Sequence, residues 1–65
     1  MCESNAYIIR DGVENLVMES VGNVTFQGNE ISLKSIFGEE TTLKARLIEV
    51  NLVGHRILLE SLEQA

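Results

Sequence analysis

Short apolar stretches separated by glycines run along the whole of this sequence. The five glycines lie at positions 12, 22, 28, 38 and 54, there is no proline, and the stretches between them are rich in Val, Ile, Leu, Thr and Phe. β-prone stretches bounded by turn residues are typical of antiparallel strands joined by tight turns. We therefore predict turns near residues 11–12, 28–29, 38–39 and 54–55.

The segment around Gly28 and Asn29 predicts a hairpin with a defined register. A two-residue loop there brings apolar pairs together on one face and polar pairs on the other, so turn chemistry and side-chain pattern agree. The predicted pairs are Val24 with Leu33, Thr25 with Ser32, Phe26 with Ile31 and Gln27 with Glu30.

A second hairpin is predicted at Gly54 and His55. A two-residue loop at this position pairs apolar residues on one face but sets two carboxylates opposite each other, which is unfavourable. The predicted pairs are Leu52 with Ile57, Val50 with Leu59 and Glu49 with Glu60.

The segment 41–53 is compatible with two local structures. Leu43, Leu47 and Val50 have helical spacing, but apolar residues also alternate, with a change of parity between Leu47 and Ile48. We interpret the segment as one bent strand with a bulge at that point, because no cap residue and stop signal frame a helix. The predicted fold is all-β: a small SH3-like or Sm-like antiparallel barrel of five to seven short strands, in which closure removes exposed edges.

Size and composition narrow the class of protein. Sixty-five residues form one small domain, residues 1–65, and a chain this short benefits from oligomerisation because its own core is limited. A single cysteine and the lack of a secretory apolar segment indicate the reducing cytoplasm, and the short apolar runs exclude a membrane span. The net charge of -5 disfavours binding to nucleic acid or anionic lipid.

Cys2 is the main candidate for a metal ligand. Most free cysteines are small buried hydrophobes, but a residue at position two is seldom buried unless the terminus is tied down. Its thiolate can form chelate rings with neighbouring nitrogens, namely the amine or main-chain nitrogens of Met1, Cys2 and Glu3. Planar nitrogen and thiolate donors suit nickel(II) or copper(II) better than magnesium or calcium. Residues 1–4 (Met1 to Ser4) are thus the predicted metal-binding N-terminus.

Other chemistry-bearing residues have weaker patterns. His55 is the single histidine and is predicted to be an exposed turn residue, with metal ligation as the alternative. Glu39 and Glu40 are interpreted as solvated turn residues. No phosphate-binding loop, nucleophile with a base, or zinc spacing occurs, so we do not predict an enzyme. The aromatic residues are assigned to the core rather than to base stacking: Tyr7, Phe26 and Phe37.

Four segments resemble the CooT family of small nickel-binding proteins. They are residues 1–7 (MCESNAY), 16–21 (LVMESV), 36–40 (IFGEE) and 49–57 (EVNLVGHRI). The resemblance covers residues 1 to about 60. It implies homodimers of SH3-like barrels, Cys2 as the nickel ligand, and a metallochaperone role in nickel supply to carbon monoxide dehydrogenase as the client enzyme.

The sequence is also compatible with two other functions. The family has also been labelled as RNA-binding, and Sm-like barrels host many functions, so an RNA-binding module is the main alternative. The negative net charge argues against it. A protein–protein adaptor without metal, in which Cys2 is incidental, is the other alternative.

Overall fold

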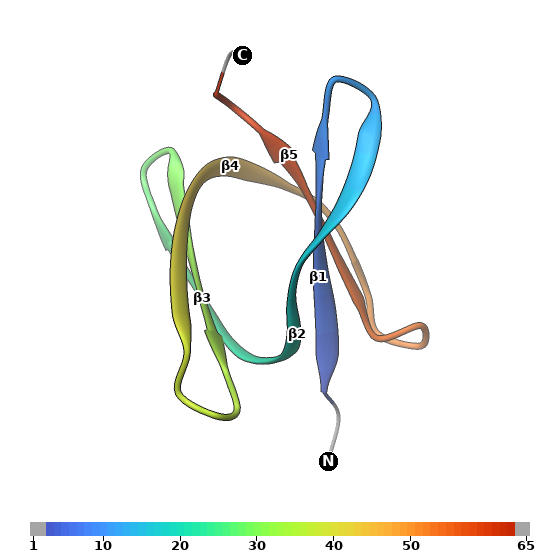
Figure 1. Cartoon of the computed structure of the whole chain (residues 1–65), viewed down its shortest axis with the longest axis vertical. Helices are drawn as coiled ribbons and strands as arrows, with labels where there is room; N and C mark the ends of the chain where they lie inside the picture. The colour runs from blue at the N-terminus through green and yellow to red at the C-terminus, as the bar shows by residue number, and fades with distance from the viewer. Residues whose placement is uncertain (1–2, 64–65) are drawn as a thin grey trace.

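Five β-strands make up the structure, a computed structural model that describes residues 3–63. The strands follow one another along the chain and form a closed ring in the order β1-β2-β3-β4-β5 (Figure 1). Their bounds are β1 Ser4–Arg10, β2 Val13–Gln27, β3 Glu30–Ser35, β4 Glu40–Asn51 and β5 Arg56–Ser61. The predicted all-β barrel is confirmed, although β2 and β4 are longer than the short strands expected.

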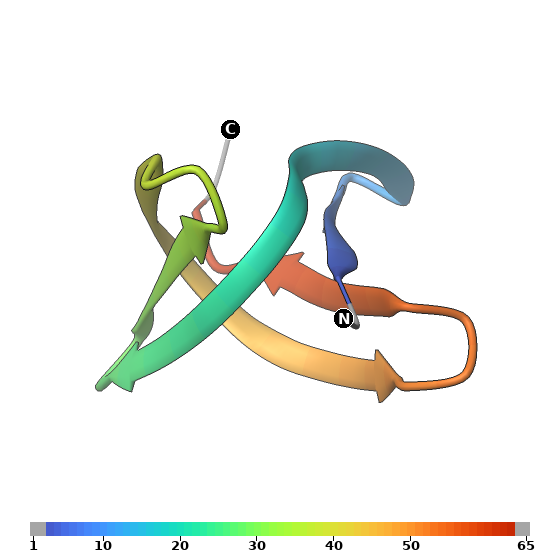
Figure 2. The same ribbon diagram turned by 90° about the horizontal axis from the view of Figure 1, so that it is seen from below.

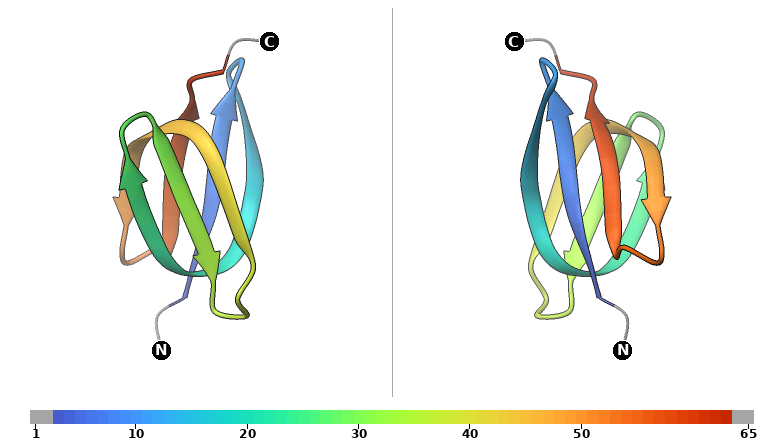
Figure 3. Two further views of the ribbon diagram at one scale, coloured as in Figure 1. Left: turned by 90° about the vertical axis from the view of Figure 1, so that its left-hand side faces the viewer. Right: turned by 90° about the vertical axis from the view of Figure 1, so that its right-hand side faces the viewer.

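The closing pair of the barrel is parallel, unlike the other four pairs. Successive strands pair antiparallel, whereas β1 and β5 run side by side in the same direction (Figure 3, right). A ring of five sequential antiparallel strands requires this, because its first and last strands point the same way. The antiparallel barrel predicted from the sequence is confirmed, with one parallel pair where the ring closes.

The core lies inside the ring and consists of side chains that alternate along the strands. Leu33 and Leu59 are the largest side chains that are completely buried, one on β3 and one on β5. Successive side chains of a strand point to opposite faces of the sheet, so every second residue faces the interior of the barrel. The buried apolar residues are Ala6, Ile8, Met18, Val21, Ile31, Leu33, Ala45, Ile57 and Leu59.

Both long strands bend where they change partners. β2 pairs with β1 up to Val21 and with β3 from Val21 onward, with Ser20 in a left-handed conformation and a bulge between Val21 and Asn23. β4 pairs with β3 up to Lys44 and then with β5, with a register shift between Leu47 and Glu49. The predicted bulge at this point is confirmed, and the helical alternative is excluded.

The hairpin at residues 28–29 forms as predicted. All four predicted pairs occur in the β2–β3 register, and Gly28 has a positive φ of 57° that favours glycine. The turn at residues 11–12 also occurs as predicted, and residues 36–39 connect β3 to β4 around the predicted position.

The β4–β5 hairpin differs from its prediction. Its turn spans residues 52–55, and Val50 pairs with Ile57 rather than with Leu59. The side-chain oxygen of Asn51 accepts a hydrogen bond from the Gly54 nitrogen at 2.8 Å, which stabilises this wider turn. The predicted pairing of Glu49 with Glu60 is absent, and Glu60 instead lies opposite Arg46, with which it forms an ion pair.

The aromatic side chains lie nearer the surface than predicted. Phe37 is 77% exposed and Phe26 is 57% exposed, while Tyr7 is half-buried. The Arg56 guanidinium carbon lies 4.6 Å from the centroid of the Tyr7 ring, which is a cation–π distance. The core prediction was wrong for Phe26 and Phe37, because the small interior is filled by aliphatic side chains, and Tyr7 lies at the edge of the core.

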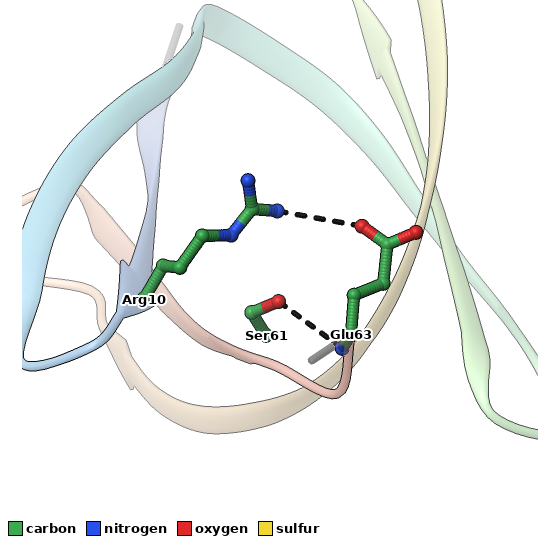
Figure 4. A network of polar contacts seen from close by, with 3 residues as sticks. All are labelled: Arg10, Ser61 and Glu63. Carbon is green, nitrogen blue, oxygen red and sulfur yellow. Dashed lines mark hydrogen bonds and ion pairs between the residues drawn. The ribbon is translucent and has the colours of Figure 1, made fainter. Parts of the chain in front are cut away.

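The end of β5 is tied to two other strands. The Leu62 nitrogen donates a hydrogen bond to the Lys44 carbonyl at 2.9 Å. In Figure 4 the Glu63 nitrogen donates to the Ser61 hydroxyl, and Arg10 reaches the Glu63 carboxylate at 3.4 Å. These contacts are exposed and each contributes about 1 kcal/mol at most, so they position the C-terminal segment more than they stabilise it.

Candidate metal site at the start of β1

The start of β1 and the β4–β5 turn share one end of the barrel. Because β1 and β5 are parallel, both begin at this end, with Asn5 paired to Arg56. The Asn5 nitrogen donates a hydrogen bond to the His55 carbonyl oxygen at 2.9 Å. Figure 1 places this end at the bottom, and Figure 2 views it directly. Residues far apart in the sequence are thus neighbours here.

Asn5 fixes the position of the chain at this end. Besides its main-chain bond to His55, its side-chain oxygen accepts a hydrogen bond from the Ser20 nitrogen at 3.2 Å. Ser20 lies at the bend of β2 and has a φ of 55°. Asn5 therefore joins β1, the β4–β5 turn and the β2 bend, and it follows the candidate ligand Cys2 by only three positions.

The predicted ligands divide into two groups. Cys2 and Met1 lie outside the described residues. Glu3 is the first described residue, is exposed and directly precedes β1. His55 is exposed, as predicted, and closes the β4–β5 turn with a φ of 56°. The fold brings the main chain of His55 to the start of β1, a proximity that the sequence did not reveal.

Acidic side chains do not assemble into a metal site in the barrel. Within residues 3–63, no three His, Cys, Asp or Glu side chains lie close enough together to hold a metal ion. Glu39 and Glu40 are both exposed at the β3–β4 connection, in agreement with their interpretation as turn residues.

The turn beside the start of β1 carries two exposed apolar side chains, and for one of them, Leu52, the predicted pairing was wrong. Leu52 is 77% exposed and Val53 is 93% exposed. Pairing Leu52 with Ile57 had placed Leu52 on the buried face. The sequence contained a sign of this exposure. Successive side chains of a strand point to opposite faces of the sheet, so Leu52 and Val53 could not both face the core.

The arginines of the barrel are individually neutralised. Arg10, Arg46 and Arg56 pair with carboxylates from other segments, and Arg56 pairs with Glu14 on β2. Lys34 and Lys44 lie opposite Glu40 and Glu30 in the β3–β4 register. The cations are therefore spread over the surface and interleaved with acidic groups.

Comparison with known proteins identifies the family. The family described as CO dehydrogenase accessory protein CooT matches residues 1–60. The chain belongs to the CooT family. The crystal structure of a protein described as CooT from Carboxydothermus hydrogenoformans is 35% identical, covers 95% of this chain and 100% of its own, and superposes with a TM-score of 0.86. An uncharacterized protein from Archaeoglobus fulgidus is 35% identical over 43 residues, which is 66% of this chain and 96% of that protein.

The match to the CooT family includes every segment of the candidate site. Residues 1–60 contain Cys2, the start of β1 and the β4–β5 turn. The resemblance noted from the sequence is confirmed, and with it the description of the family as an accessory to CO dehydrogenase. Residues 3–63 contain no helix that is long and apolar enough to cross a membrane.

Proposed function

We propose that this CooT protein binds nickel(II) in the cytoplasm and acts as a metallochaperone that supplies it to carbon monoxide dehydrogenase. The observation that carries the proposal is the family match, which includes Cys2 and describes an accessory protein of that enzyme. Nickel is the cargo of the protein in this proposal, and the enzyme is its client.

The proposed ligands are the Cys2 thiolate and the main-chain nitrogens next to it, those of Met1 and Glu3 included. Thiolate and nitrogen donors in a plane favour nickel(II) or copper(II) over zinc, which prefers a tetrahedron. The anchoring of Asn5 supports this assignment because it holds the chain in place just after these donors. His55 is a secondary candidate, since its main chain lies beside the start of β1.

Titration of the full-length protein with nickel(II), followed by absorption spectroscopy, tests the proposal. We expect a saturable thiolate-to-nickel charge-transfer band, because the ligand is a thiolate and the chain has one cysteine. Zinc has a filled d shell and serves as the control, with no such band expected. Nickel binding that saturates without the band contradicts the proposed ligand.

We further propose that the protein is a homodimer that buries the β4–β5 turn. Two arguments support this dimer. A short chain gains stability by sharing apolar surface with a second chain. In addition, Leu52 and Val53 are exposed next to the start of β1 and could form that shared surface. A two-fold axis near this turn would bring two N-termini together. Two Cys2 thiolates would then be available to one nickel ion.

Val53→Glu is expected to weaken this dimer by at least roughly tenfold, because burying a Val side chain is worth about 1.5 kcal/mol or more. Sedimentation equilibrium measures the dissociation constant. Val13→Glu is the matched control, since Val13 is 57% exposed at the opposite end of the barrel. A wild-type protein that stays monomeric at high concentration, with and without nickel, overturns the dimer.

We do not favour RNA binding as the function. Non-specific affinity for RNA depends on neutralising phosphates. The net charge is -5, and the three arginines are paired with carboxylates.

A further inference from the structure

A groove lies between β2 and the start of β4, and its lining residue Ser20 is hydrogen-bonded through its nitrogen to the Asn5 side chain of the candidate metal site. Its volume is approximately 530 Å³. One wall is formed by residues 16–20 of β2, and the other by Phe37 and residues 39–41 at the β3–β4 connection. The groove is therefore open along the length of a strand rather than a closed cavity for a small molecule.

Each wall of the groove contains a strand edge without a strand partner in the described part of the chain, at residues 16–19 of β2 and at the start of β4, whereas the Ser20 carbonyl already accepts a hydrogen bond from the Ile36 nitrogen. Between Val13 and Met18, β2 pairs with β1 along one edge, and its pairing with β3 begins only at Val21. Residues 40–44 of β4 pair with β3, and the pairing of β4 with β5 begins at Ala45. An unpaired strand edge presents main-chain donors and acceptors that can pair with an added strand.

The groove combines an apolar surface with negative charge. Leu16 is 52% exposed and Phe37 is 77% exposed. Glu19, Glu39 and Glu40 are exposed lining residues and form no ion pair within residues 3–63.

Among residues 3–63, no lysine or arginine lines the groove. Lys34 lies opposite Glu40 in the strand register, without an ion pair between them.

The same carboxylates are not arranged as a metal site. Within residues 3–63 no three metal-binding side chains lie close enough together to hold an ion. Their charges instead lie on both walls of the groove, with Glu19 on β2 and Glu39 and Glu40 at the β3–β4 connection, where several cationic groups on an extended chain can reach them separately.

We propose that the groove binds an extended basic segment of a partner protein. The backbone of the segment pairs with the free edge of β2 at residues 16–19. Its Lys or Arg side chains approach Glu19, Glu39 and Glu40, and an apolar side chain packs against Phe37. Charge complementarity selects the partner, and main-chain pairing supplies affinity that does not depend on side-chain identity. This interaction does not require nickel.

Binding of a labelled eight-residue peptide of alternating Lys and Val to the full-length protein tests the proposal by fluorescence anisotropy. We expect saturable binding that Glu39→Lys combined with Glu40→Lys weakens by at least about tenfold, because two attractions become repulsions. Glu30→Lys combined with Glu49→Lys is the matched control. It makes the same charge change at exposed carboxylates outside the groove, and we expect less than about a twofold effect.

Two further measurements separate the contribution of main-chain pairing from that of charge attraction. A peptide N-methylated at every residue keeps its side-chain charges but loses the main-chain donors of both edges, and we expect it not to bind. Amide chemical-shift changes on peptide addition are expected at residues 16–19 of β2. Equal weakening by the groove and control variants, or shift changes confined to the second half of β4, overturns the proposal. The same holds if the groove variants change the oligomeric state, which would assign the groove to a second copy of this chain.

Discussion

Cys2→Ser is expected to abolish the nickel charge-transfer band and to lower nickel affinity by at least about 100-fold. Changes in groups that only support a ligand commonly cost 10–100-fold in metal affinity, and this substitution removes the charged donor itself. Because protons compete with nickel for the thiolate, the wild-type affinity is also expected to fall as the pH is lowered. Titration by absorption spectroscopy, repeated at several pH values, measures both effects.

The nickel affinity of His55→Ala, compared with that of Cys2→Ser, shows which of the two residues is the nickel ligand. We expect His55→Ala to change nickel affinity by less than about tenfold, since in the proposed site the main-chain nitrogens complete the donor set without the imidazole. The main-chain bond from Asn5 to His55 survives this substitution, so the end of the barrel stays intact. Full affinity in Cys2→Ser, or complete loss in His55→Ala, would reverse the ranking of these two residues.

Leu59→Ala is expected to destabilise the barrel by about 3 kcal/mol and to lower Tm by roughly 20 °C. Leu59 is completely buried on β5 and belongs to the core cluster. A chain of this length has a total unfolding free energy of only about 3–10 kcal/mol. The loss is therefore a large part of the total, and thermal unfolding followed by circular dichroism measures it.

Leu16→Ala is the matched control for this effect. It removes the same atoms from a leucine that is 52% exposed on β2, and we expect a cost below about 1 kcal/mol. Both variants are compared at one protein concentration, because association with a second chain would add to the apparent stability. Similar losses at the two positions would contradict the difference in burial between Leu59 and Leu16.

Local signals predicted most of the strands and one register. The hairpin at residues 28–29 was correct in every pair because turn chemistry and alternation specify the same register. The bulge after Leu47 was correct because a parity change marks an extra residue. The β4–β5 turn was wrong because the Asn51 side chain stabilises a longer turn, and because Leu52 and Val53 are apolar yet exposed.

The candidate site was harder to predict because it depends on contacts between distant residues. Cys2 was predicted to be a metal ligand only from its place near the N-terminus and from the chemistry of its thiolate. The proximity of His55 to the start of β1 follows from the parallel pairing of β1 with β5, which no local pattern encodes. The same holds for the groove, whose walls come from β2 and the start of β4. The exposure of Phe37 was missed because aromatic residues are usually assigned to the core.

The parallel pairing of the first and last strands also sets the order of events during synthesis on the ribosome. Of the five strands, β1 leaves the exit tunnel first and its partner β5 leaves last, so β1 has only β2 to pair with until β5 has emerged. Contacts between the two ends of a chain are slow to form because a long loop must close first. The hydrogen bond from Asn5 to His55 forms only with that closure. The pairing of β1 with β5 is therefore the last part of the barrel to assemble, and a nascent chain that ends before β5 lacks it.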